Sequence, residues 1–226
     1  MGESPATQES TVSAVHGAAP EPDAQLRSDT YRVLGNLLAA APDDETLALF
    51  ANAPVSEDDD LLAVAWRLLA TSAARTSGRQ AADEFQALFI GIGRGELMPF
   101  GSWYLTGFLM EKPLAKLRSD LATLGFERHD DVTEPEDHAA ALCETMALLA
   151  EDGELESLQT QAEFFRAHIG PWMARFFRDM QEATSARFYR AVGQLGEQFI
   201  ETDQRYLEMV ERPEEIPAEP NGSGHS

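Results

Sequence analysis

Apolar residues recur at intervals of three and four along most of the chain, the spacing of one face of an α-helix. The pattern begins at Ala24, is interrupted by glycines and prolines, and continues to Val210. No stretch alternates apolar and polar residues as a strand would, and no internal repeat is present. The pattern therefore predicts an all-α fold, a single globular helical domain of about eight to ten helices. Helices are expected near residues 24–41, 43–50, 57–69, 81–89, 103–124, 139–150, 155–165, 172–180 and 185–210.

Two of these helix starts are predicted from capping boxes, in which a Ser or Thr hydroxyl and an acidic side chain three residues later satisfy free backbone amides. One box pairs Ser56 with Asp59, and the other pairs Thr133 with Glu136. The first helix is expected to bury its apolar residues Leu61, Leu62, Ala65, Leu68 and Leu69. The second carries an apolar stripe that comprises Ala139, Leu142, Cys143, Met146, Leu149 and Ala150.

A glycine-rich stretch, residues 91–101, interrupts the helical pattern. It matches neither a P-loop nor a dinucleotide fingerprint, because no strand precedes it and no Gly-Lys-Ser/Thr follows. A long loop with apolar residues is more typical of a binding element or a crossing between helices. After it, Trp103, Leu105, Phe108 and Leu109 are expected to begin a helix that Pro113 restarts or kinks and that Gly125 caps.

The two ends of the chain differ from its middle in composition. Residues 1–23 contain few large apolar groups and predict a disordered N-terminal extension. Residues 212–226 are rich in Pro, Gly, Ser and Glu and predict a disordered acidic tail. No linker-like stretch divides residues 24–211, so these are expected to form one helical domain.

The net charge of −22, from 39 acidic and 17 basic residues, narrows the choice of partners. Such a field repels nucleic-acid backbones and anionic membranes, whereas it attracts basic peptides. Part of the charge serves solubility and part lies in the tail, so it does not identify a cationic partner by itself. Nucleic-acid binding and stable membrane insertion are not expected.

Three further features indicate the cytoplasm. The first residues lack the apolar block of a signal peptide, and no apolar run is long enough to cross a membrane. The single cysteine, Cys143, excludes an internal disulfide and lies on an apolar stripe, where a buried structural role is expected.

Around the predicted helix start at Thr133, acidic residues exceed what a cap requires. Asp137 and His138 could form an acid–base pair, but neighbouring side chains on a helix point about 100° apart. No nucleophile in a recognisable elbow accompanies them, which makes a hydrolase a minor hypothesis. Glu134 and His138, four residues apart, could share a metal, yet no second such motif follows, and no metal or other cofactor is expected.

Each of these residues also has a structural interpretation. His138 could be a helix-start residue that is hydrogen-bonded to a neighbouring loop. Aromatic residues at helical spacing usually fill a core, and this applies to Trp66, Trp103, Tyr104 and Trp172. Trp103 and Tyr104 follow the irregular glycine-rich stretch, residues 91–101, so they could instead line a peptide groove.

Four stretches, in this order along the chain, resemble the TorD/DmsD family of cytoplasmic chaperones for molybdenum-cofactor oxidoreductases. They are Tyr31-x-x-Leu34-x-x-Leu37-Leu38; Phe85-x-x-Leu88-Phe89-x-Gly91, which leads into Pro99-Phe100-Gly101-Ser102-Trp103-Tyr104; Glu134-Pro135-x-Asp137-His138, with Met146 further on; and His168-x-x-Pro171-Trp172-x-x-x-Phe176. The segment from Tyr104 to Leu114 is most similar to members associated with formate dehydrogenase.

The resemblance implies a function without turnover: the chaperone holds the twin-arginine leader of its client until the cofactor is inserted. It implies leader binding by Asp137 and His138, near the region that contains Pro99, Ser102, Trp103 and Tyr104. Glu134 and Glu136 complete the predicted peptide-binding set. The client is expected to be a molybdoenzyme catalytic subunit of the formate dehydrogenase, DMSO reductase or TMAO reductase type.

The resemblance also implies a monomer or a swapped dimer and weak GTP binding, for which no motif in this sequence gives support. Two alternative hypotheses stay open: a helical adaptor that docks a folded partner, and the His/Asp-dependent hydrolase.

Overall fold

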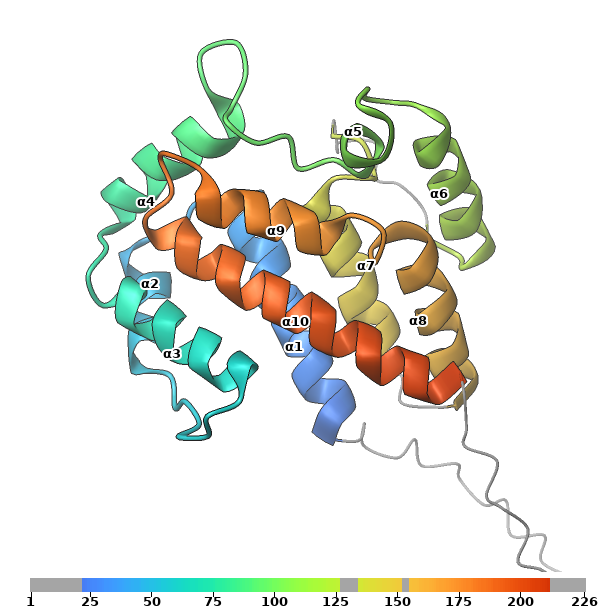
Figure 1. Ribbon diagram of the computed structural model, residues 1–226, viewed down its shortest axis with the longest axis horizontal. Coiled ribbons are helices and arrows are strands. Elements are labelled where there is room, and N and C mark those ends of the chain that lie inside the picture. The colour runs from blue at the N-terminus through green and yellow to red at the C-terminus, as the bar shows by residue number, and fades with distance from the viewer. Residues whose placement is uncertain (1–21, 127–133, 152–154, 212–226) are drawn as a thin grey trace, which may run out of the picture.

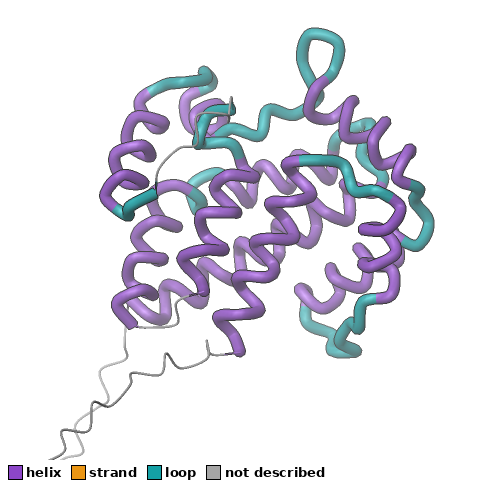
Figure 2. The backbone as a smooth tube through the Cα atoms, turned by 180° about the vertical axis from the view of Figure 1, so that it is seen from behind, coloured by secondary structure: helices purple, strands orange, loops and turns teal. Residues whose placement is uncertain are grey.

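The computed structural model describes residues 22–126, 134–151 and 155–211, and every regular element in these ranges is a helix (Figure 2). Ten α-helices and one π-helix follow one another in this part of the chain, which confirms the predicted all-α fold. The predicted N-terminal extension lies outside the described residues, except for Pro22 and Asp23, which begin α1. The predicted acidic tail, residues 212–226, lies wholly outside them.

The helices run in the order shown in Figure 1. They are α1 (Pro22–Ala39), α2 (Asp44–Asn52), α3 (Leu61–Ala73), α4 (Gly78–Phe85), the π-helix η1 (Gln86–Ile90), α5 (Gly101–Thr106), α6 (Lys112–Thr123), α7 (Ala139–Glu151), α8 (Leu155–His168), α9 (Met173–Glu182) and α10 (Phe188–Glu211).

The core forms where α1 packs along α7 and where the long helix α10 crosses α9, α3 and α8 (Figure 1). Two glycines let α10 approach α9 closely. A Cβ atom on Gly196 would lie 2.4 Å from the ring of Phe177, and one on Gly193 would lie 2.7 Å from the Phe177 carbonyl oxygen. Both distances are too short for a real contact, so this helix crossing requires residues without a side chain.

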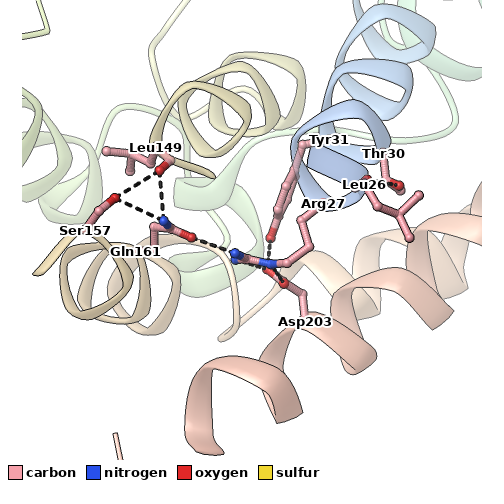
Figure 3. A network of polar contacts seen from close by, with 8 residues as sticks. All are labelled: Leu26, Arg27, Thr30, Tyr31, Leu149, Ser157, Gln161 and Asp203. Carbon is pink, nitrogen blue, oxygen red and sulfur yellow. Dashed lines mark hydrogen bonds and ion pairs between the residues drawn. The ribbon is translucent and has the colours of Figure 1, made fainter. Parts of the chain in front are cut away.

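A buried polar network joins four helices through the core (Figure 3). Arg27 of α1 forms an ion pair with Asp203 of α10, and its guanidinium also donates to Gln161 of α8 at 2.7 Å. The Tyr31 hydroxyl donates to Asp203 at 2.7 Å, and the Gln161 amide donates to the carbonyl oxygen of Leu149 in α7 at 2.8 Å. Because the charges of Arg27 and Asp203 are buried, each side chain depends on the other.

Asp60, and not Ser56, caps the N-terminus of α3. Its carboxylate accepts hydrogen bonds from the amides of Leu62 and Ala63, each at 3.0 Å, whereas the Ser56 hydroxyl donates to Asp58. The predicted capping box of Ser56 and Asp59 is therefore wrong. The predicted buried face is also partly wrong: Ala65 and Leu69 are buried, Leu62 is half-buried, and Leu61 and Leu68 are exposed. A capping box occurs instead at Ser77 and Gln80, where α4 begins.

The helix predicted to start at Trp103 and include Leu109 is shorter than expected. Helix α5 ends at Thr106 because Gly107 adopts a left-handed conformation, with φ of 81°. Phe108 and Leu109 consequently lie in a loop, and α6 begins anew at Lys112 with Pro113 in its first turn. The predicted restart at Pro113 is confirmed, as is the end of this helix near Gly125.

The helix predicted to include Phe85 and Phe89 changes its hydrogen-bonding pattern at Gln86. From Gln86 to Ile90 the backbone is a π-helix, which closes with a bond from the Gly91 amide to the Gln86 carbonyl oxygen at 2.7 Å. Such short π-helical turns often mark functional regions. The loop that follows projects from the helical body in both views (Figures 1 and 2). It contains the predicted site residue Pro99 and leads to α5, which contains Ser102, Trp103 and Tyr104.

Candidate functional site

Backbone hydrogen bonds join the two segments that contain the predicted site residues. The Gly101 amide donates to the Asp137 carbonyl oxygen at 2.9 Å, and the Ala139 amide donates to the Pro99 carbonyl oxygen at 2.8 Å. Between these bonds, Phe100 and His138 form an antiparallel bridge. The start of α5 and the start of α7 are thus fixed side by side, although more than thirty residues separate them.

Asp137 lies at the centre of this junction. The residue is only 3% exposed, and its Oδ2 atom accepts a hydrogen bond from the Ser102 amide at 2.7 Å, in the first turn of α5. Its Oδ1 atom is also buried and has no hydrogen-bond partner among the residues that the structure describes. A buried carboxylate oxygen without a donor is costly, so such an atom indicates a position where a donor from elsewhere would be stabilised.

Asp137 lines a cavity of about 230 Å³ between α5, α6, the start of α7 and the end of α8. Ser102 and His168 add polar groups to its wall, and Lys116 adds a charged one. The other lining residues are mainly apolar: Gly101, Leu105, Pro113, Leu117, Leu142, Ala167 and Trp172. The cavity therefore combines one buried acid with a mostly apolar wall, the usual composition of a ligand pocket.

Gly101 brings the backbone of α5 against the indole of Trp172. A Cβ atom at Gly101 would lie 3.1 Å from Trp172 Nε1, tighter than most real contacts, so a side chain here would push the two apart. The indole is fixed in turn by a hydrogen bond from Nε1 to the His168 carbonyl oxygen at 2.7 Å. Trp172, predicted as a core residue, thus fills the core and lines the cavity as well.

His138 caps the N-terminus of α7. Its Nδ1 atom accepts a hydrogen bond from the Ala140 amide at 3.1 Å, and its carbonyl oxygen accepts one from the Leu142 amide at 3.1 Å. An accepting Nδ1 carries no proton, so the neutral ring carries its proton on Nε2, which lies 3.5 Å from Glu134. Burial lowers the pKa of His138, and the negative charges of Glu134 and Asp137 only partly oppose this effect. His138 is thus a helix-start residue, as its structural interpretation has it, but its ring bonds to the Ala140 amide of its own helix and not to a neighbouring loop.

The predicted capping box of Thr133 and Glu136 is wrong, because α7 begins at Ala139 and is capped by His138. Thr133 itself lies outside the described residues. The Glu136 carboxylate accepts from the guanidinium of Arg118 in α6, with its two oxygens each 3.0 Å from Nε. Glu134, near the N-terminus of α7, has a largely exposed side chain. Of the three predicted carboxylates, only that of Asp137 lines the cavity.

Trp103 and Tyr104 do not line the cavity with Ser102. Trp103 is half-buried, and the guanidinium of Arg94, from the projecting loop, lies 4.9 Å from the centre of its ring. Tyr104 packs its ring on Trp172, with 5.4 Å between centres, and donates its hydroxyl to Asp179 at 2.9 Å. Burial raises the pKa of Tyr104, and the bond to Asp179 adds to this effect. Tyr104 therefore attaches α5 to α9.

A chain of three polar side chains connects α6 to α8 beside the cavity. Lys116 lies 2.5 Å from Asp120, which in turn lies 2.7 Å from Nε2 of His168. Lys116 lowers the pKa of Asp120, whereas burial lowers the pKa of His168. A second hollow of about 420 Å³, also between α6 and α8, shares Lys116 and Ala167 with the first. The two hollows are thus adjacent.

The loop that follows α5 presents three large apolar side chains to solvent. Phe108 is 68% exposed, Met110 is 72% exposed, and Leu109 between them is 41% exposed. The loop is nevertheless well tied: the Met110 amide donates to the Ser102 hydroxyl, and the Phe108 amide donates to the Thr106 hydroxyl. Met110 adopts a left-handed conformation, with φ of 59°, which is unfavourable for a residue with a side chain. These three residues are called the apolar loop below.

Sequence reasoning missed several residues of this site. Lys116 and His168 were not predicted there, and Leu105, Leu117 and Leu142 were predicted only as core positions. Leu114, Leu117 and Leu121 of α6 form a narrow stripe like that of any core-facing helix, so residue spacing does not separate the cavity residues from the core.

The arrangement offers little support for catalysis or metal binding. Asp137 bonds to Ser102 while His138 bonds to Ala140, so the two side chains do not form the expected acid–base pair. Within the described ranges, no group of three His, Cys, Asp or Glu side chains is placed to hold a metal ion. None of the helices in these ranges combines the length and apolarity needed to cross a bilayer.

Comparison with known proteins gives relatives over most of the chain. A TorD chaperone of Vibrio cholerae is 26% identical over 204 residues, which cover 81% of this chain and 93% of that protein. The Tat proofreading chaperone DmsD of Salmonella typhi is 29% identical over 175 residues, or 74% of this chain and 83% of that protein. Both relatives are named as chaperones.

Among solved structures, a proposed redox enzyme maturation protein from Archaeoglobus fulgidus aligns with a TM-score of 0.46 and 16% identity, over 81% of this chain and 94% of that one. A family model described as the nitrate reductase delta subunit matches residues 56–178, which is 123 of the 226 residues. With TorD and DmsD chaperones as its relatives and more than half of its length matched by the family model, the chain belongs to the TorD/DmsD family of molybdoenzyme maturation chaperones.

Proposed function

We propose that this protein binds the twin-arginine leader of an apo molybdoenzyme and holds it, in the cytoplasm, while the cofactor is inserted. The observation that carries the proposal is Asp137, which lines a cavity with mainly apolar walls and whose buried Oδ1 atom has no hydrogen-bond partner among the described residues. A twin-arginine leader combines guanidinium groups with an apolar segment. The guanidinium groups would supply the donor that the Asp137 carboxylate needs, and the apolar segment would pack on the apolar wall.

In this proposal, one leader arginine donates to Asp137 Oδ1. The interaction is charge-assisted and involves a carboxylate on a residue that is only 3% exposed, and such bonds are worth roughly 1.5–3 kcal/mol each. The second arginine forms an ion pair with Glu134, whose exposed carboxylate lies near His138 at the N-terminus of α7. Glu136 is assigned a different role, since a leader arginine would first have to displace Arg118 from it.

The apolar segment of the leader would pack between α6 and α8. The adjacent hollows of about 230 and 420 Å³ supply space there, and the apolar loop supplies exposed side chains next to Leu105. Helix α6 has few contacts with the rest of the fold apart from α5 and α8, so a modest movement of α6 would widen this groove. Lys116 and Asp120 would separate from His168 in that movement.

The client is a molybdoenzyme catalytic subunit, with the formate dehydrogenase type first and the DMSO and TMAO reductase types as alternatives. This order depends on the resemblance of the segment from Tyr104 to Leu114, which contains the apolar loop.

Isothermal titration of the full chain with a synthetic twin-arginine leader tests the proposal. Two charge-assisted bonds and a partly filled groove predict a dissociation constant in the micromolar range, equivalent to about −8 kcal/mol. A matched leader with both arginines replaced by glutamine should bind at least about tenfold more weakly, since the apolar segment alone remains. Equal affinity for the two leaders would contradict the proposal.

A further inference from the structure

A wide hollow lies apart from the proposed leader site. It measures about 790 Å³ and lies between α3, α4 and the first turns of α10. Figure 1 shows these elements at one side of the molecule, with α5 and α6 at the other side. No predicted site residue lines it.

The charge of this groove is opposite to that of the chain as a whole. Three of the 17 basic residues, Arg75, Arg187 and Arg190, line it with exposed side chains, although the net charge of the protein is −22. Among the described residues, neither Arg75 nor Arg187 has an acidic side chain within ion-pair distance, whereas Arg190 donates to the carbonyl oxygen of Gln181 at 3.1 Å. At least two guanidinium groups in the groove are therefore available to an anionic partner.

The acidic residues of the groove do not neutralise these arginines. Glu84 is buried, and its carboxylate accepts from the amides of Arg187, Phe188 and Tyr189, at 2.7, 3.1 and 2.7 Å. It is thus engaged with the N-terminus of α10, where an acidic group is stabilised. Asp83 is the other acidic side chain on the lining, and it is exposed.

We propose that this groove binds an acidic peptide segment of a partner protein. The arginines come from two different segments, since Arg75 follows the end of α3 whereas Arg187 and Arg190 flank the start of α10. The wall between them contains apolar groups of Leu68, Ala87 and Phe188. Separate guanidinium groups around an apolar strip match a peptide that carries several carboxylates and apolar side chains on one face.

A compact phosphate is a poorer match for the same groove. Phosphate sites at a helix N-terminus use the free backbone amides of the first turn. In this groove the amides at the start of α10 already bind the carboxylate of Glu84, so only the separate arginine side chains remain. Nucleic acid is disfavoured by the net charge.

Fluorescence anisotropy with the full chain tests this proposal. The probe is a labelled synthetic helical peptide with glutamates on one face and leucines on the other, and a matched peptide has glutamine at each glutamate. The acidic peptide should bind, with an affinity that falls as salt is raised, and the glutamine peptide should bind more weakly. The double variant Arg75→Gln and Arg187→Gln should lose about tenfold in affinity, because an exposed ion pair accounts for roughly two- to fivefold.

Arg205→Gln is the control variant, because Arg205 lies on α10 outside the groove and donates to the Glu201 carbonyl oxygen and the Thr202 hydroxyl. It should bind the acidic peptide as the unaltered protein does. All these variants should bind a twin-arginine leader with unchanged affinity, which separates this proposal from that of the leader site and shows that the variants are folded. The proposal is overturned if the acidic peptide does not bind, if the groove variants bind it normally, or if sodium pyrophosphate alone binds in an arginine-dependent way.

Discussion

The Asp137 carboxylate bonds to the Ser102 amide at 2.7 Å, and the Asp137 carbonyl oxygen bonds to the neighbouring Gly101 amide at 2.9 Å. One residue thus fixes the start of α5 with its side chain and its backbone together. The second oxygen of the same carboxylate is buried and accepts no hydrogen bond from the part of the chain that the structure describes. Asp137 therefore has a structural role and a proposed binding role, and a substitution to alanine would remove both.

His138 should stabilise the protein by capping the N-terminus of α7. His138→Ala removes the acceptor for the Ala140 amide and should lower the free energy of unfolding by about 1 kcal/mol, as loss of an N-cap usually does. His138→Asn supplies an oxygen acceptor at the same position and should stay close to the unaltered protein. Urea denaturation measures both. An asparagine variant as unstable as the alanine variant would show that the cap is not what His138 contributes.

Two buried histidines, His138 and His168, should lower the free energy of unfolding in mild acid. Burial lowers the pKa of His138 and of His168 in the folded protein, so the unfolded chain binds their protons more readily. Their contribution to the free energy of unfolding is therefore complete above the pKa of about 6.5 that they have in the unfolded chain. It is lost as the pH falls through their lower pKa values in the folded protein. Urea denaturation from about pH 7.5 to about pH 5.5 should show a falling free energy of unfolding.

His168→Gln is the control for this pH effect. It removes one of the two titrating groups, so the decrease in stability between the two pH values should become smaller. The pKa of Asp120 is lowered by Lys116 and affects stability only at more acidic pH. A decrease of the same size in this variant would mean that His168 does not contribute.

The buried ion pair of Arg27 and Asp203 should be essential for stability. Asp203→Ala leaves the Arg27 guanidinium and the Tyr31 hydroxyl without their acceptor in the core, at a cost of about 3–5 kcal/mol. Asp29→Ala, an exposed carboxylate on the same helix as Arg27, should cost less than about 1 kcal/mol. Thermal unfolding followed by circular dichroism compares the two, and similar losses would contradict the central place of the network shown in Figure 3.

The apolar loop should contribute to leader binding without contributing to the core. Phe108→Ser with Met110→Ser changes two largely exposed side chains, so stability should stay within about 0.5 kcal/mol. Leader affinity should fall about tenfold, because each side chain would lose the apolar area that the leader covers. Leu49→Ser, an equally exposed leucine on α2, is the control and should bind the leader normally. Calorimetric titration gives the affinities, and an unaltered affinity in the double variant would remove the apolar loop from the site.

The sequence predicted the helices well because each helix has a local signal. Apolar residues at three- and four-residue spacing mark α1, α7 and α10 without reference to the rest of the fold. Helix starts were less predictable: Ser56 and Thr133 had the spacing of capping boxes, yet Asp60 and His138 perform the capping. Several polar residues in a row offer alternative caps, and tertiary contacts such as that of Glu136 with Arg118 decide among them.

The site was predictable only as a set of segments. Family resemblance indicated the segments of Pro99 and Asp137, and the structure joins them through the bond of Asp137 to Ser102. Neither the cavity nor the free Oδ1 atom follows from residue spacing, since both depend on how α6 and α8 pack around the junction. The buried pair of Arg27 and Asp203, at opposite ends of the domain sequence, has no local signal at all.

Leader titration of Asp137→Asn tests the central claim most directly. The asparagine carbonyl oxygen can still accept from the Ser102 amide, which fixes the side-chain orientation and places the NH₂ group at the position of the buried Oδ1 atom. An acceptor for arginine thus becomes a donor, while the attachment of α5 is retained. We predict an affinity at least about tenfold lower than that of the unaltered protein, with a melting temperature that is unchanged or higher because a buried charge is removed. An unchanged affinity in the folded variant would contradict the account.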